Sequence, residues 1–181
     1  MSDRELQRLD FLNTAGLADA VRRPLPGDAS TRRYERLTTP SGLTLMLMDQ
    51  VPAAESQPCD PGWSPAQRHA AGWNAVARLS AGRIEAFAAV AANLRQAGLS
   101  APDIIAVDAA NGLAVIEDFG DDLFARVIET GEPEAPLYLA AVEAIARLHQ
   151  TGLLPDAMPG LAGDWPLLTY DAVALQGGAD Q

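Results

Sequence analysis

Paired apolar runs of strand length occur in this chain only before Gly120, and that limit sets the fold. Before Gly120, apolar runs of strand length come in pairs, and turn residues separate the members of each pair. One pair is Arg33 to Leu37 with Leu43 to Met48, and the other is Ile104 to Val107 with Leu113 to Glu117. After Gly120, apolar residues recur at helical spacing. We therefore expect an antiparallel sheet with helices packed against it, followed by a helical segment, which is an α+β fold.

Helical patterns surround these two hairpins. Ser2 and Glu5 have the spacing of a capping box, in which a hydroxyl and a carboxylate satisfy the free amides of a first turn. Asp121 or Asp122 is expected to cap the helix that follows. Pro24 to Ser30 is turn material, and so is most of the tail. The expected helices cover Leu6 to Gly16, Pro65 to Leu79, Ile84 to Leu94, Leu123 to Ile128 and Leu137 to Gln150, with a further start at Asp171 to Leu175.

Composition excludes several classes of partner. Hydrophobic residues make up 48% of the 181, which predicts a folded core. A net charge of -11 makes binding to nucleic acid or to an anionic membrane surface a poor expectation. No apolar stretch approaches the roughly 20 residues that span a bilayer. Cys59 is the single cysteine, so no internal disulfide can form, and a reducing cytoplasm is the expected compartment.

Asp118-Phe119-Gly120 matches a metal-binding motif of protein kinases, but its surroundings differ. That motif works together with a His-x-Asp-x-x-x-x-Asn loop, which supplies the base and a second metal ligand, and no such loop precedes or follows it here. An apolar strand leading into an acidic turn also suits a hinge between two lobes, where backbone groups of Glu117 to Phe119 can pair with an adenine edge. Glu117 and Asp118 would then point outward or cap the next helix. A plain strand end with an acidic helix start is compatible with the same residues.

The segment Gly27-Asp28-Ala29-Ser30-Thr31-Arg32-Arg33-Tyr34 is the candidate phosphate site. Gly27 allows a phosphate to approach the backbone closely, and Ser30 can donate a hydrogen bond to it. Arg32 and Arg33 are suited to bidentate phosphate contacts. The alternative is an ordinary turn that enters an edge strand. The segment lacks the Gly-Lys-Ser/Thr of a Walker loop.

Met48 ends the second strand, where a kinase normally has a lysine that reaches the α- and β-phosphates. All 13 basic residues of this chain are arginine. Met48 is therefore expected to line the core or an adenine pocket, and Arg32 or Arg33 would have to supply the positive charge. His149 is interpreted as a partner of a helix C-terminus. No residue is assigned as catalytic base or metal ligand.

Taken in order, five short motifs resemble the aminoglycoside phosphotransferase superfamily. Within it, the chain looks most like the bacterial anomeric sugar kinases that act on N-acetylmuramate and N-acetylglucosamine in cell-wall recycling. Those relatives also carry Met-Asp in place of the strand lysine. The motifs are Gly27 to Tyr34, Leu47-Met48-Asp49, Leu99 to Ile104, Ile116 to Asp122 and Ala146 to His149.

The resemblance implies a small lobe over residues 1–117, and a hinge with the start of a helical large lobe over residues 118–181. It assigns Gly27 to Ser30 to a phosphate-facing loop, Met48 to the lysine position and Glu117 to Phe119 to the adenine hinge. ATP with Mg²⁺ would phosphorylate a sugar hydroxyl. The family's catalytic loop and magnesium-binding Asp would lie beyond Gln181, so this chain is expected to lack the magnesium ligands.

Three functions stay open at this point. The chain is part of an ATP-dependent sugar kinase, or a truncated paralogue that binds nucleotide or protein, or a fragment without a function of its own. In the second case the helix from Leu137 to Gln150 would expose an apolar stripe of Ala141, Ile145 and Leu148. Such a stripe favours a homodimer.

Overall fold

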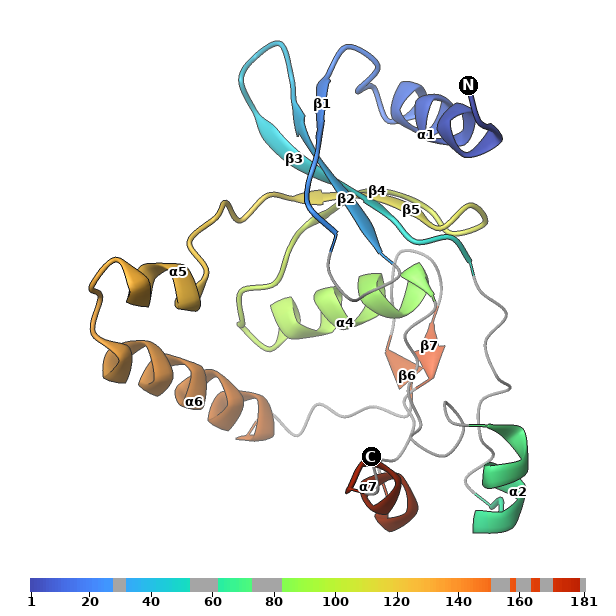
Figure 1. The fold of residues 1–181 in the computed structure, drawn as a ribbon, viewed down its shortest axis with the longest axis vertical. Coiled ribbons are helices and arrows are strands. Elements are labelled where there is room, and N and C mark those ends of the chain that lie inside the picture. Colours follow the sequence, from blue (N-terminus) through green and yellow to red (C-terminus); the bar gives the residue numbers. More distant parts are fainter. Residues whose placement is uncertain are drawn as a thin grey trace.

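A computed structural model describes residues 1–27, 32–52, 62–72, 83–150, 157–158, 164–166 and 171–179. Its centre is a five-stranded antiparallel sheet in the order β1-β2-β3-β5-β4. Helix α1 lies on one side of this sheet, whereas α4, α5 and α6 lie on the other (Figure 1). The expected α+β class, with a kinase-like small lobe, is confirmed. The strands are β1 (Val21–Pro24), β2 (Arg33–Thr38), β3 (Thr44–Asp49), β4 (Ile104–Asp108) and β5 (Leu113–Glu117).

Both predicted hairpins are present, and glycine closes each turn. Gly42, at φ 86°, lies between β2 and β3, where the Thr39 N–H donates to the Leu43 carbonyl at 2.9 Å. Gly112, at φ 64°, lies between β4 and β5. Its carbonyl accepts from the Gln50 N–H at 2.9 Å and so joins this turn to the end of β3. These φ values fall in the left-handed region that glycine enters without steric cost.

Strand β1 is missing from the sequence prediction. Its register pairs Val21 with Thr38 and Pro24 with Glu35. The interpretation of Pro24 as the start of a turn was therefore wrong at that residue. A proline is tolerated here because β1 is an edge strand, on which one side of the backbone needs no partner. Two arginines in four residues hid the strand from an apolar pattern.

Helix α1 (Asp3–Thr14) covers the upper face of the sheet, which we define as the face that carries Leu37 and Leu47. Phe11 and Leu12 of the helix are buried against it. Removing these side chains from water is the main stabilising term at this face. The buried cluster consists of Phe11, Leu12, Leu37, Leu45, Leu47, Leu113 and Val115.

Ion pairs also hold α1 to the sheet. Arg8 Nε donates to Asp49 Oδ2 at 2.6 Å, and Arg4 binds the other oxygen of the same carboxylate. Burial opposes the ionisation of Asp49, but the hydrogen bonds from Arg4 and Arg8 hold the pKa of Asp49 below its ordinary value. Successive strand residues point to opposite faces, so Asp49 anchors α1 while Met48 faces the other side.

The capping box predicted at Ser2 forms only in part. The Ser2 hydroxyl accepts from the Glu5 N–H at 3.2 Å, as predicted. The Glu5 carboxylate instead binds Arg22 of β1 and Arg8. Arg22 also binds Glu35, with 2.7 Å between Nε and Oε2. Tertiary ion pairs have therefore taken the carboxylate that local spacing assigned to the cap.

Helix α4 (Ile84–Gln96) packs on the lower face of the sheet, which we define as the face that carries Met48 and Ile116. Ile84 is buried in one cluster with Met48, Ala114 and Ile116. The helix covers the predicted range and ends before Gly98, at φ 74°. This end is the left-handed glycine stop that the sequence predicts.

The segments after β5 differ from the prediction at their ends. Neither Asp121 nor Asp122 caps α5, because Leu123 is the N-cap residue and makes no side-chain capping bond. Helix α6 begins at Glu134, three residues before the predicted start at Leu137. Two short paired strands, β6 and β7, occur where a loop was expected. The helices are α5 (Phe124–Glu129), α6 (Glu134–Gln150) and α7 (Ala172–Ala179), with β6 (Ala157–Met158) and β7 (Trp165–Pro166) between α6 and α7.

Helix α2 (Pro65–Ala71) begins with a complete capping box between Ser64 and Gln67. It matches the start of the helix predicted from Pro65 to Leu79, and residues 73–79 of that prediction lie outside the described ranges. Among the described residues, no helix is both long enough and apolar enough to cross a bilayer.

Candidate functional site

The lower face of the sheet carries two rows of side chains beside the end of β5. In one row, Arg36 of β2 is opposite Met46 of β3, which is opposite Ile116 of β5. In the other, Tyr34 is opposite Met48. Met48 is fully buried, whereas Tyr34 and Met46 are half-buried. Each row therefore contains one buried and one half-buried apolar side chain on this face.

Met48 is a core residue. This is one of the two roles predicted for it, the other being the lining of an adenine pocket. It lies in the apolar cluster with Ile84, Ala114 and Ile116, and its side chain has no exposed surface. A cation at this position would have to leave water entirely. The structure thus gives a physical reason for methionine where kinases have lysine.

The connector, which we define as residues 118–123 between β5 and α5, is bound by one arginine of β2. Arg36 Nε donates to Asp118 Oδ2 at 2.6 Å, and Nη2 donates to Oδ1 of the same residue at 3.1 Å. Arg36 also reaches Asp121, with Nη1 to Oδ2 at 2.9 Å and Nη2 to Oδ1 at 3.0 Å. We call Arg36, Asp118 and Asp121 the Arg36 clamp. Paired bonds of this kind are the strong form of an arginine–carboxylate contact.

The clamp corrects the expected orientation of Asp118. Its side chain is only 5% exposed, so it does not point outward, and it caps no helix. Burial opposes the ionisation of Asp118, but the hydrogen bonds from Arg36 and from the Gly120 N–H keep its pKa below its ordinary value. The hydrogen bond from Arg36 lowers the pKa of Asp121 as well. Both carboxylates are therefore charged at neutral pH and paired with the guanidinium.

Glu117 and Phe119 do not belong to the clamp, and their surroundings differ from those of Asp118. The Glu117 N–H donates to the Asp103 carbonyl at 2.9 Å, and the Glu117 carboxylate accepts from the Asp103 N–H at 3.1 Å. Glu117 therefore ties the end of β5 to the entry of β4. Phe119 is 58% exposed. The three residues predicted as one adenine hinge have three different environments.

The candidate phosphate segment is described at Gly27, Arg32 and Arg33, whereas Asp28 and Ser30 lie outside the described ranges. A Cβ placed on Gly27 would come within 2.7 Å of Arg33 Nη1, so the Arg33 guanidinium lies against this glycine. The Arg32 guanidinium instead lies over the Phe87 ring of α4, 5.6 Å from its centroid. The two adjacent arginines therefore contact different parts of the molecule. Arg33 lies against Gly27, and Arg32 lies against α4.

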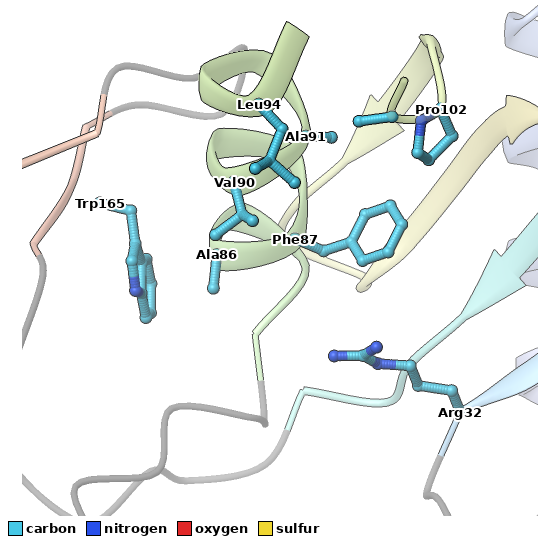
Figure 2. Close-up of a pocket in the computed structure, with 9 residues that line it drawn as sticks. Arg32, Ala86, Phe87, Val90, Ala91, Leu94, Pro102 and Trp165 are labelled. Carbon is cyan, nitrogen blue, oxygen red and sulfur yellow. The ribbon is translucent and has the colours of Figure 1, made fainter. Parts of the chain in front are cut away.

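Arg32 lines a pocket of about 260 Å³ along α4. Figure 2 shows Phe87 and Pro102 on the side of the sheet and Trp165 of β7 on the other side of the helix. Of the predicted site residues that the structure describes, Arg32 belongs to this lining, while Met48 and Glu117 to Phe119 do not. The structure therefore groups Arg32 with α4 and groups Asp118 with Arg36.

Sequence reasoning missed Arg36. It belongs to no motif, and the only available signal was an arginine on the same strand face as Tyr34. Its partners are 82 and 85 residues away in the chain. Within the described ranges, no three His, Cys, Asp or Glu side chains gather in a way that could hold a metal ion.

An antiparallel five-stranded sheet, a helix on its lower face and a connector leading into helices define a kinase-like phosphotransferase lobe. The chain belongs to the phosphotransferase enzyme family, whose model matches residues 21–177. It is 50% identical over 175 residues to the N-acetylmuramate/N-acetylglucosamine kinase of Caulobacter vibrioides. That match covers 97% of this chain and 48% of the relative, so the chain spans about half the length of this curated relative.

Proposed function

We propose that this chain provides the nucleotide-binding lobe and connector of an ATP-dependent kinase that phosphorylates an amino sugar such as N-acetylmuramate or N-acetylglucosamine. Such a kinase would act in the cytoplasmic recycling of cell-wall sugars. The observation that carries this proposal is the 50% identity over nearly the whole chain to a kinase named for these two sugars. Residues 1–117 would form the small lobe, and residues 118–181 the connector and the start of the helical lobe.

The lower face of the sheet suits a purine. Met46 is half-buried and offers apolar surface beside the connector, and the Ile116 opposite it is buried. Apolar lining with a few fixed polar groups is the usual composition of a small-molecule site. The Glu117 carbonyl and the backbone of Asp118 and Phe119 would pair with the adenine edge, because the Glu117 N–H already donates to the Asp103 carbonyl. Met48 would support the face from the core.

The phosphates would lie toward the turn before β2. Gly27, Asp28 and Ser30 would face them, and Arg32 or Arg33 would supply positive charge. Arg36 binds the carboxylates of Asp118 and Asp121. Magnesium does not fit the described residues, since Asp118 and Asp121 are both paired with Arg36.

Phosphoryl transfer tests this proposal. The purified chain would be compared with a chimera that adds the part of the Caulobacter kinase that this chain does not match. We expect both proteins to bind a fluorescent ATP analogue, and only the chimera to phosphorylate N-acetylmuramate, because positioning and charge stabilisation dominate this chemistry. Equal turnover by both proteins would show that the chain alone is catalytic. Binding of the analogue by neither would remove the nucleotide lobe from the proposal.

We also propose that α6 mediates self-association. Tyr138, Val142 and Ile145 are each more than half exposed, and their spacing places them on one side of the helix. Ile145 belongs to the stripe expected to be exposed, whereas Ala141 and Leu148 of that stripe are half-buried. An exposed apolar strip of this kind is typical of an interaction surface, and a second copy is the partner we propose.

Sedimentation checks this second proposal. The unmodified chain is expected to sediment as a dimer, and Val142→Glu as a monomer, because the new carboxylate would be buried unpaired in the interface. Ala140→Glu is the matched control, since Ala140 lies on the opposite side of the same helix and should leave the dimer intact. A monomeric unmodified chain would contradict the proposal.

A further inference from the structure

Arg36 connects the interior of the sheet to a segment more than 80 residues later. It is opposite Met46, and Met46 is opposite Ile116, so two strand pairings separate Arg36 from the strand that leads into the connector. From β2 its guanidinium makes four hydrogen bonds to Asp118 and Asp121. One side chain therefore holds the connector at two points, three residues apart.

The backbone between those two points forms a tight turn. The Gly120 N–H donates to Asp118 Oδ1 at 2.9 Å, and Gly120 adopts φ 78°. The Leu123 N–H donates to the Asp121 carbonyl, also at 2.9 Å. Both carboxylates that Arg36 binds thus belong to residues whose own groups shape the turn. Release of the Asp118 carboxylate would remove the acceptor of the Gly120 N–H, and release of the Asp121 carboxylate would leave the turn at Leu123 without its anchor to β2.

The planar guanidinium is the group that this arrangement requires. It presents five donors in a rigid fork, so it can bind two carboxylates in pairs, whereas an ammonium is a compact point charge without that geometry. Because two carboxylates bind one guanidinium, the clamp has no net positive charge with which to attract a phosphate. Arg36 therefore acts on the connector rather than directly on a bound nucleotide.

We propose that Arg36 is a positioning residue that fixes the course of the connector, and with it the backbone N–H and C=O groups that the connector presents to a purine. This inference rests on the proposed function, in which the connector pairs with the adenine edge. The clamp binds no ligand itself. It selects one connector conformation before the nucleotide arrives, which reduces the ordering cost of binding.

Two measurements on the full chain test this role. Amide hydrogen exchange at Gly120 and Leu123 reports the connector itself, and titration with a fluorescent ATP analogue reports its consequence. In Arg36→Gln, exchange at both amides is expected to rise by about tenfold or more, and affinity for the analogue to fall by about tenfold. Arg36→Lys should recover little of either, because an ammonium cannot pair with both carboxylates.

Arg22→Gln is the matched control. Like Arg36, Arg22 binds two carboxylates, here those of Glu5 and Glu35, but it belongs to the edge strand β1 and lies on the face of α1. Its loss should lower overall stability while exchange at Gly120 and Leu123 stays within about twofold of the unmodified chain once global unfolding is subtracted. Affinity for the analogue should also stay unchanged.

Each outcome decides the proposal. Unchanged connector exchange in Arg36→Gln, or an equal rise in Arg22→Gln, would overturn it. If Arg36→Gln does not fold, Asp121→Asn replaces it, because Asp121 is 58% exposed and the variant removes one half of the clamp. No rise in exchange at Leu123 in that variant would also overturn the proposal. If the unmodified chain does not bind the analogue, the proposed function fails, and the exchange data still decide the role of Arg36.

Discussion

Met48→Lys is expected to lower the free energy of unfolding by roughly 4 kcal/mol, equivalent to a shift of about three pKa units for a buried amine. The Met48 side chain is fully buried among Ile84, Ala114 and Ile116. An ammonium there loses its hydration among apolar side chains. Urea denaturation followed by circular dichroism measures the change.

Met48→Leu is the control for this substitution. It nearly conserves volume and adds no charge, so it should cost less than about 1.5 kcal/mol. The difference between the two variants should shrink as the pH rises from about 7 to about 9, because burial lowers the pKa of the new amine and the neutral form folds with less penalty. Equal stability of both variants at neutral pH would mean that a lysine can be accommodated at this strand position, as in other kinases.

Gly112→Ala is expected to destabilise the chain by about 3 kcal/mol, from left-handed strain of roughly 1–2 kcal/mol together with overpacking. Gly112 has φ 64°, and a Cβ added there would lie 2.0 Å from the Gln50 carbonyl oxygen. That neighbour is backbone and is itself at the end of β3, so it cannot rotate away. The Gln50 N–H also donates to the Gly112 carbonyl at 2.9 Å, so a shift of the turn would weaken this bond.

Gly42→Ala separates strain from collision. Gly42 has φ 86°, but an added Cβ would meet no atom within 4 Å. We expect this variant to lose only about 1 kcal/mol, the part due to backbone conformation. The two alanine variants would be compared by urea denaturation under the same conditions. Similar losses in both would show that the β4–β5 turn can move away from β3, and that the start of β5 is not fixed there.

Elements with a local signal were predictable. The two hairpins and α4 follow from apolar runs of the right length and from glycines at their turns or ends, and α6 follows from its apolar spacing. Strand β1 carries no such signal, because it is a short edge strand with two arginines that is recognisable only once it pairs with β2. The start of α6 was misplaced because a helix can extend beyond its apolar stripe.

The residues of the candidate site also divide into those that a local signal predicts and those that depend on distant partners. Met48 was predicted to line either the core or an adenine pocket, because the chain has no lysine, and its burial agrees with the first of these roles. The orientation of Asp118 was not predictable, because its partner Arg36 is 82 residues away and no local rule links them. Asp121 has the spacing of a helix cap, but its carboxylate accepts two hydrogen bonds from the same arginine instead.

The sequence by itself determined the two hairpins with their turns and the apolar helices, though not strands β1, β6 and β7, and it determined that no lysine of this chain can serve a phosphate. These properties depend on neighbours a few residues apart, and such contacts are encoded in short patterns. Only the tertiary structure decided that Asp49 holds α1, that Arg32 and Arg33 serve different surfaces, and that Arg36 holds the connector. Those pairings depend on the order and register of the strands, which bring distant charges together only after the sheet has formed.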